Sequence, residues 1–214
     1  MAHTTVADEH RPRRWLAAAG VLGPATFVAD WAVLGATSRG YSPVEDAISR
    51  LAATGASTRG AMTAGFVAYG AGLVLYAIPV RAAVAGRAWM WVAATGVATF
   101  GVAAFPLGTQ VSGNVHAVFA TVGYATLAAV PLTAAPVLAR AGRRGWARVS
   151  VAAGALCAGA LLASIVGPTS VHGLLQRLGL TVGDAWLVVS AGWLLTRAGS
   201  PRHGGAEVGS ALRA

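Results

Sequence analysis

Apolar residues in this 214-residue chain gather into six long runs separated by short polar segments. The runs lie near 15–37, 61–80, 89–106, 114–139, 149–167 and 180–197. A helix needs about 20 apolar residues to span the hydrocarbon core of a membrane, because each residue adds about 1.5 Å. The pattern therefore predicts an all-α, polytopic transmembrane helix bundle with six transmembrane helices. The prolines Pro131 and Pro136 predict a kink or an end in the fourth of them.

The composition agrees with helices that face lipid rather than water. Charged residues make up 11% of the sequence, and the mean hydropathy is +0.62. A soluble domain contains about 25% charged residues, which its helices need in order to build a polar face. This chain has too few charges for six such faces. We therefore expect the lipid bilayer to be its main partner.

The distribution of arginine predicts the orientation of the helices. Twelve of the 16 arginines lie in the terminal segments and in the connections after the second and fourth runs. The other four lie in the first and last connections and are Arg39, Arg50, Arg59 and Arg177. Because positive residues stay on the cytoplasmic side, we expect a multi-pass protein of the cell (plasma) membrane with both termini in the cytoplasm. Arginines clustered between apolar runs also disfavour a nucleic-acid partner.

The polar ends of the chain and its small residues complete the predicted architecture. We expect a disordered cytoplasmic N-terminal tail at 1–14, the six-helix transmembrane domain at 15–197 and a disordered cytoplasmic C-terminal tail at 198–214. The 28 glycines and abundant alanine allow close packing of membrane helices. Gly154 with Ala158 is one pair at the spacing that such contacts use.

Two connections on the outer side carry the pattern of short amphipathic helices. In the first, Ser42 can act as an N-cap, Pro43 suits the first helical position, and Glu45 completes a capping box. Apolar residues then follow on one face, and Gly55 can end the helix. Residues 168–179 show the same arrangement with a different sequence. The pattern predicts two short amphipathic helices on the outer surface, which would cover the bundle as a lid.

Several short motifs occur in a fixed order along residues 15–197. They are Gly23-Pro24, the run Tyr41-x-Pro43-x-x-Asp46-x-Ile48-Ser49-x-Leu51, Gly65-Phe66, Phe105-Pro106, His116 and Leu175-Gln176-Arg177. Together they resemble the bacterial membrane family called domain of unknown function 998. The resemblance implies a six-helix membrane protein and supplies no activity. Members of that family often have an acidic residue soon after Phe-Pro and a second histidine near the fourth helix. This chain has neither, which weighs against a metal site.

Polar residues that fall toward the outer side form the candidate ligand-binding pocket. They are Asp30, Asp46, Ser49, Arg50, His116, His172, Gln176, Arg177 and Asp184. A charge at the bilayer centre costs about 2.5–3.5 kcal/mol on insertion scales. Asp30 is therefore expected to face the interior and to pair with Arg177, Arg50 or His116.

Three classes of function are open at this point. The first is binding or transport of a small molecule or lipid headgroup, for which Arg50 and Arg177 suit an anionic group. The second is a metal-dependent membrane hydrolase, in which His116, His172 and one of the candidate aspartates hold Zn²⁺. The third is a structural or partner-binding subunit. The sequence contains no HExxH, GxSxG or CxxC motif, so an enzyme is disfavoured, and no catalytic residue, metal or cofactor is assigned.

Overall fold

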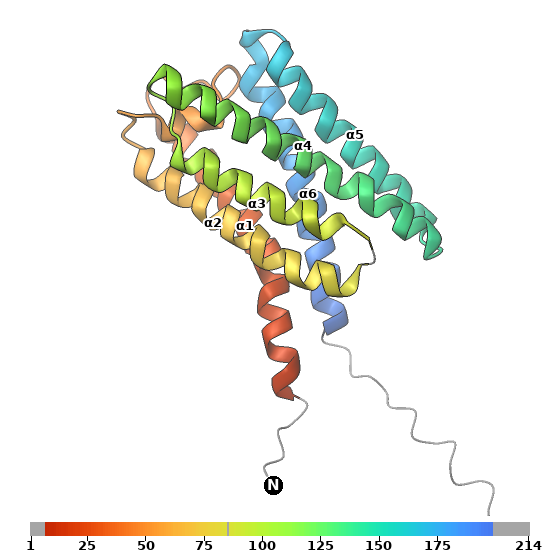
Figure 1. The fold of residues 1–214 in the computed structure, drawn as a ribbon. Helices are drawn as coiled ribbons and strands as arrows, with labels where there is room; N and C mark the ends of the chain where they lie inside the picture. Colours follow the sequence, from red (N-terminus) through yellow and green to blue (C-terminus); the bar gives the residue numbers. More distant parts are fainter. Residues whose placement is uncertain (1–6, 85, 199–214) are drawn as a thin grey trace, which may run out of the picture.

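The computed structural model describes residues 7–84 and 86–198, and within them it contains helices and loops but no strand (Figure 1). The α-helices are α1 (Ala7–Thr37), α2 (Arg59–Ala83), α3 (Ala88–Ala104), α4 (Gln110–Arg140), α5 (Arg144–Val166) and α6 (His172–Ala198). Two 3-10 helices lie in the loops, η1 (Ile48–Ala52) and η2 (Thr169–Val171). The prediction of an all-α fold is confirmed.

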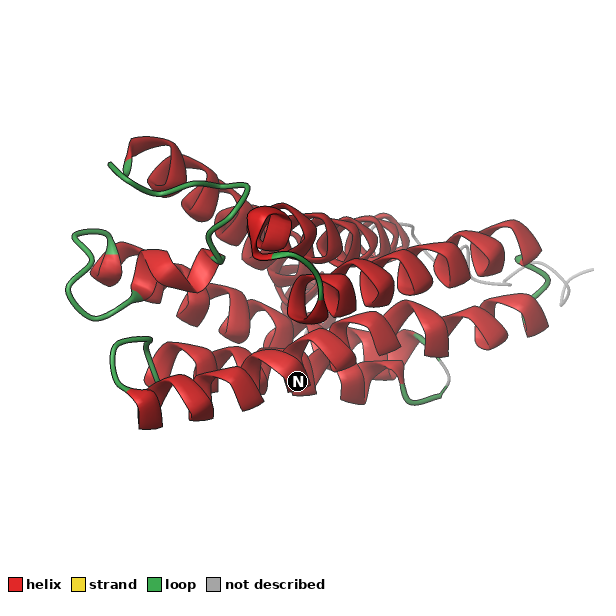
Figure 2. Ribbon diagram, turned by 90° about the horizontal axis from the view of Figure 1, so that it is seen from above, coloured by secondary structure: helices red, strands yellow, loops and turns green. Residues whose placement is uncertain are grey.

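The helices form a ring. Each helix packs against the next one along the chain, and α1 also packs against α6. Figure 2 shows the helices lying side by side in one bundle. Additional contacts join α6 to α4 and to α2 across the ring. Helix α6 therefore supplies residues to the centre of the bundle as well as to its wall.

The outer surface of the ring is apolar. Large hydrophobic side chains are exposed on every one of the six described α-helices, with Leu22, Val67, Val97, Leu132, Leu162 and Val189 as examples. Five helices are long and apolar enough to cross a membrane, and the shorter apolar helix α3 has 17 residues. A soluble protein rarely exposes so continuous an apolar surface. The described helices therefore have the character of a multi-pass membrane protein.

The structure decides between two alternatives for the fourth run and moves the boundary of the first. Helix α4 continues through Pro131 and Pro136 to Arg140, so neither proline ends it. Neighbouring helices in a membrane bundle can satisfy the backbone groups that a proline frees. Helix α1 includes residues 7–14, which we expected in a disordered tail, because a helix propagates into its flanks once it has nucleated. The rest of that tail and residues 199–214 lie outside the described residues.

Glycines bring α2 close to both of its neighbours. A Cβ on Gly72 would lie 2.9 Å from the Ala19 carbonyl oxygen of α1, and a Cβ on Gly70 would lie 2.8 Å from the Gly96 carbonyl oxygen of α3. Gly154 is also buried, against α4, whereas Ala158 is exposed. The predicted pair therefore does not form one contact surface.

The two connections predicted to form amphipathic surface helices take other forms. In the first, Glu45 N donates to Ser42 Oγ over 3.3 Å, but only the five residues of η1 become helical. Ile48 and Leu51 of η1 are each 2% exposed, because they turn into the bundle instead of lying on a membrane surface. In the last connection, residues 172–179 are the first two turns of α6, since a single continuous helix satisfies more backbone groups than two short ones.

Three connections meet at one end of the bundle, which we call the loop end. They are residues 38–58, 105–109 and 167–171. Thr54 N donates to the Leu107 carbonyl over 2.7 Å, and Leu174 N, in the first turn of α6, donates to the Val44 carbonyl over 2.9 Å. The opposite end, called the terminal end, holds the start of α1, the end of α6 and the connections at 84–87 and 141–143.

Candidate functional site

The first turns of α6 hold the 38–58 connection in place through Arg177. Its Nη1 donates to three carbonyl oxygens, those of Pro43 at 2.7 Å, Asp46 at 2.9 Å and Gly173 at 2.9 Å. Gly173 permits this approach, because a Cβ there would lie 2.8 Å from the Pro43 oxygen. Arg177 is only 7% exposed, so its charge is used for fastening the connection rather than displayed to solvent.

Aromatic rings complete the surroundings of the Arg177 guanidinium. Its carbon lies 5.3 Å from the centre of the Trp31 ring and 5.5 Å from that of Tyr41. Nη2 donates to Tyr41 Oη, which in turn donates to the Ala47 carbonyl over 3.2 Å. Burial raises the pKa of Tyr41, and Arg177 opposes that rise. Tyr41 is therefore a neutral hydroxyl at pH 7 and can act as both acceptor and donor.

Gln176, next to Arg177 on α6, holds η1 against the bundle by hydrogen bonds. Its Oε1 accepts a hydrogen bond from Ile48 N over 2.8 Å, and its Nε2 donates to Tyr124 Oη of α4. Gln176 is 5% exposed. A buried side chain thus links α4, α6 and η1, and the connection lies on the bundle as a fastened cover.

Beneath this cover lies a cavity of about 60 Å³, which we call the loop-end cavity. Of the predicted site residues, Ser49, His116 and Gln176 line it. Ser49 is 8% exposed, and its hydroxyl has no hydrogen-bond partner among the described residues. A hydroxyl that no protein group engages is free to bond a molecule in the cavity.

The rest of the cavity wall is mostly apolar. Phe27, Phe66 and Phe119 line it, together with Leu127. Thr95 and Thr99 add two hydroxyls to the wall. Both already bond within the protein: Thr99 Oγ1 donates to the Thr95 carbonyl, and Thr95 Oγ1 lies 2.9 Å from Thr126 Oγ1. An apolar chamber with a few polar groups is the usual form of a small-molecule site.

His116 is held by the 105–109 connection. Its Nδ1 lies 2.8 Å from the Phe105 carbonyl oxygen, and because a carbonyl can only accept, Nδ1 carries the proton. His116 is 6% exposed. It therefore ties this connection to α4 as well as lining the cavity.

Asp46 and Arg50 lie outside the cavity, on the solvent side of the cover. Asp46 Oδ2 accepts from Ser42 N over 2.8 Å, and Oδ1 lies 3.1 Å from Arg50 Nη1. Both residues line an open surface hollow that lies beside the 38–58 connection. The structure therefore divides the predicted pocket between an interior chamber and an exposed surface.

Three further predicted residues lie elsewhere. Asp30 is half-buried beside Gly65 of α2 and makes no hydrogen bond or ion pair within the described chain. The expected pairing with Arg177, Arg50 or His116 is not observed. The Asp30 carboxylate lies instead against Gly65, which has no side chain and therefore leaves room for the carboxylate but provides no hydrogen-bond donor. His172 Nδ1 donates to the Ser164 carbonyl over 2.6 Å.

Asp184 lies deeper in the bundle. Its Oδ1 accepts a hydrogen bond from Tyr69 Oη of α2 over 2.7 Å, and the residue is 2% exposed. Its Oδ2 is buried without a hydrogen-bond partner in the described part of the chain. Tyr69 lines the loop-end cavity but Asp184 does not, so this carboxylate lies behind the cavity wall.

The ligand set of the metal-hydrolase hypothesis does not assemble. Within residues 7–84 and 86–198, no three histidine, cysteine, aspartate or glutamate side chains gather closely enough to hold a metal ion. Zinc sites use three or four such ligands. The donors of His116 and His172 are instead committed to backbone carbonyls.

Comparison with known proteins identifies the family. The family model described as protein of unknown function (DUF998) matches residues 21–193. The chain belongs to the DUF998 family. No curated protein and no solved structure matches the chain.

The structure explains why the residues that suggested DUF998 occur together. Tyr41, Asp46 and Ile48 form the cover, and Gln176 and Arg177 fasten it. These residues are far apart in the sequence but form one hydrogen-bonded unit at the loop end. For this DUF998 protein, the motif therefore describes how the cover is built.

Three tyrosines that serve as partners were not among the predicted site residues. Tyr41, Tyr69 and Tyr124 bond Arg177, Asp184 and Gln176 respectively. For Tyr69 and Tyr124, the position of a tyrosine inside an apolar run was a usable signal, because its hydroxyl needs a partner when buried. Which partner it finds depends on how the helices face one another.

Proposed function

We propose that this DUF998 protein binds a small molecule in the loop-end cavity, beneath the cover formed by residues 38–58. The observation that carries the proposal is the cavity of about 60 Å³, with the unpartnered hydroxyl of Ser49 in its wall. The ligand is small and largely apolar, with a polar group for Ser49, because most of the other surface of the cavity is apolar. Opening the cover requires release of Arg177 and Gln176, so these residues act as the latch.

The interior of the bundle favours binding over transport in this conformation. Along α2, Tyr69 lines the loop-end cavity, whereas Tyr76, two turns further on, lines a second cavity at the terminal end. Between these positions lies Leu73, which is fully buried, and on α6 Leu187 is 1% exposed. A molecule in the first cavity is therefore separated from the second by a packed layer.

We also propose that all six helices span a bacterial cell membrane, with the loop end outside and both termini in the cytoplasm. The arginines at the terminal end include Arg14, Arg81, Arg87, Arg140, Arg143, Arg144 and Arg148. Basic residues on short connections favour the cytoplasmic side. Helix α3 is about 26 Å long at 1.5 Å per residue and packs between α2 and α4, so it crosses the membrane with them.

Single cysteines can test this orientation, because the one native cysteine, Cys157, is buried. In intact spheroplasts, an impermeant maleimide should label Ser57→Cys, in the exposed 38–58 connection, but not Ala141→Cys, in the exposed connection between α4 and α5. Opening the membrane should make both sites reactive, and the unmodified chain is the unlabelled control. Labelling of Ala141→Cys but not Ser57→Cys in intact spheroplasts would invert the proposed topology.

A variant that fills the cavity can test ligand binding. Ala120 lines the loop-end cavity, whereas Ala117, one turn earlier on α4, is exposed and does not line it. A library of small metabolites is screened for compounds that raise the melting temperature of the purified protein. A ligand at about 100 times its Kd adds about 2.7 kcal/mol of stability. The stabilisation should persist in Ala117→Phe and disappear in Ala120→Phe.

The comparison of the two phenylalanine variants is decisive only if both fold, so their ligand-free melting temperatures are measured first. If every stabilising compound acts equally on both variants, the ligand binds elsewhere. If no compound acts on the wild-type protein, the binding proposal fails. In that case the second candidate, a structural or partner-binding subunit, gains support from the internal hydrogen bonds of His172, Gln176 and Asp184.

A further inference from the structure

A second cavity of about 90 Å³ lies at the terminal end of the bundle, and we call it the terminal-end cavity. Helices α2 to α6 all contribute to its wall, which is almost entirely apolar. The apolar lining includes Val92, Val130, Ala134 and Leu194. Polar side chains in the wall are paired: Tyr76 Oη lies 2.8 Å from Ser190 Oγ, and Trp186 Nε1 donates to Ser150 Oγ over 3.0 Å.

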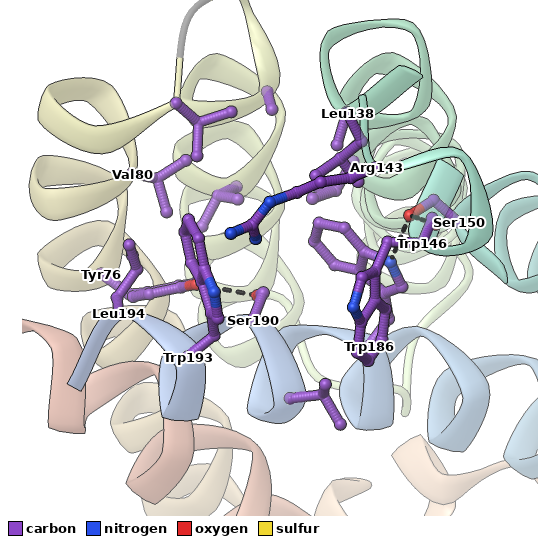
Figure 3. A pocket seen from close by; sticks show the side chains of 16 residues that line it. Tyr76, Val80, Leu138, Arg143, Trp146, Ser150, Trp186, Ser190, Trp193 and Leu194 are labelled. Atoms are coloured by element: carbon purple, nitrogen blue, oxygen red, sulfur yellow. Dashed lines mark hydrogen bonds between the residues drawn. The ribbon is translucent and has the colours of Figure 1, made fainter. Parts of the chain in front are cut away.

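One cation enters this apolar chamber. Arg143, at the start of α5, points its guanidinium into the cavity beside the Trp193 ring, 4.6 Å from the ring centre (Figure 3). No carboxylate lines the cavity, and Arg143 has no ion-pair partner among the described residues. A half-buried guanidinium in such a place is suited to an anion, and arginine binds phosphate groups through paired hydrogen bonds.

The cavity also reaches the side of the bundle. Trp146 of α5 and Val189 of α6 belong to its wall, yet they are 52% and 51% exposed. Tryptophan is enriched where a membrane helix meets the headgroup region. A chain-bearing molecule can therefore enter between α5 and α6 from the lipid phase, with its charged group at the level of Arg143.

We infer that the terminal-end cavity binds an acidic phospholipid, with its phosphate group on Arg143 and part of an acyl chain among the apolar side chains. Basic pockets between membrane helices on the cytoplasmic side bind anionic headgroups. The apolar volume distinguishes this ligand from free phosphate, which would leave most of the chamber unfilled. The inference concerns a different cavity from the loop-end cavity and does not depend on ligand binding there; its placement on the cytoplasmic side rests on the proposed orientation.

Adjacent arginines supply a matched pair of variants. Arg143 lines the cavity, whereas Arg144 is exposed and does not. Delipidated protein in detergent is titrated with phosphatidylglycerol or phosphatidylcholine, and bound lipid is counted by native mass spectrometry. Phosphatidylglycerol should bind to the wild-type protein and to Arg144→Gln, and about tenfold more weakly to Arg143→Gln. Phosphatidylcholine should bind at least tenfold more weakly than phosphatidylglycerol to the wild-type protein.

Further arms of the experiment separate the remaining explanations. Millimolar inorganic phosphate should not displace bound phosphatidylglycerol; displacement would indicate a free-phosphate site and overturn the inference. Ala134→Leu, which fills the apolar part of the chamber while leaving Arg143 in place, should also weaken lipid retention. If Arg143→Gln and Arg144→Gln lose the same affinity for phosphatidylglycerol, the lipid is attracted by a basic surface and not bound in the cavity, which would overturn the inference. Melting temperatures of all variants establish that they fold, and unchanged binding in both Arg143→Gln and Ala134→Leu would also overturn the inference.

Discussion

Replacing Arg177 with alanine is expected to lower the free energy of unfolding by about 2–4 kcal/mol. The substitution removes the donor for the carbonyls of Pro43 and Asp46 and the partner of Tyr41. Partly buried carbonyl groups left without a donor retain part of their desolvation penalty, which is why the cost exceeds that of an ordinary surface contact. The measurement is unfolding of the purified protein in mixed micelles with a denaturing detergent.

Arg50→Ala is the control for this experiment. Arg50 belongs to the same end of the molecule, but its side chain is 63% exposed and its ion pair is with Asp46. An exposed ion pair contributes about 0–1 kcal/mol. If the two alanine variants lose the same stability, Arg177 does not fasten the cover. Ser49→Cys should also react faster with a thiol reagent in the Arg177→Ala background, because the cover then opens more often.

Gly72→Ala is expected to destabilise the bundle by about 1–3 kcal/mol through overpacking. The added Cβ would lie 2.9 Å from the Ala19 carbonyl oxygen and 3.0 Å from Gly23 Cα. Both are backbone atoms of α1, so no side chain can rotate away, and the two helices must move apart. Lower melting temperature in detergent is the readout.

Gly192→Ala tests the same change of residue where space is available. No atom lies within 4 Å of a Cβ built on Gly192, which is also inside a helix. Alanine at such a position restricts the unfolded chain and favours the helix, so stability should be unchanged or rise by about 0.4–1 kcal/mol. A loss of stability in Gly192→Ala similar to that in Gly72→Ala would show that glycine matters here for a reason other than helix contact.

The two cavities give the molecule different chemistry at its two ends. At the loop end, Arg177 is committed to backbone carbonyls and the cavity offers a neutral hydroxyl, that of Ser49. At the terminal end, Arg143 has no carboxylate partner in the described chain and remains available to an anion. An arginine beside a cavity is therefore informative about a ligand only once its own partners are known.

The sequence by itself determined the number, type and approximate limits of the helices. In lipid, a run of about 20 apolar residues with few charges must satisfy its own backbone hydrogen bonds, and a helix does this within the run itself. The predicted second run, 61–80, lies inside the observed α2, and the DUF998 resemblance agreed with this architecture. These features depend on local composition, which is fully present in the sequence.

Only the tertiary structure decided which polar residues meet. Arg177 and Pro43, which share a hydrogen bond, are 134 residues apart. Asp184 accepts its hydrogen bond from Tyr69 and not from an arginine. Contacts of this kind depend on the rotation of each helix about its axis, which glycine contacts such as Gly72 against α1 set. The form of the cover was decided in the same way: Ile48 turns inward because the ring leaves a space beneath it, and no local pattern in residues 42–55 records that space.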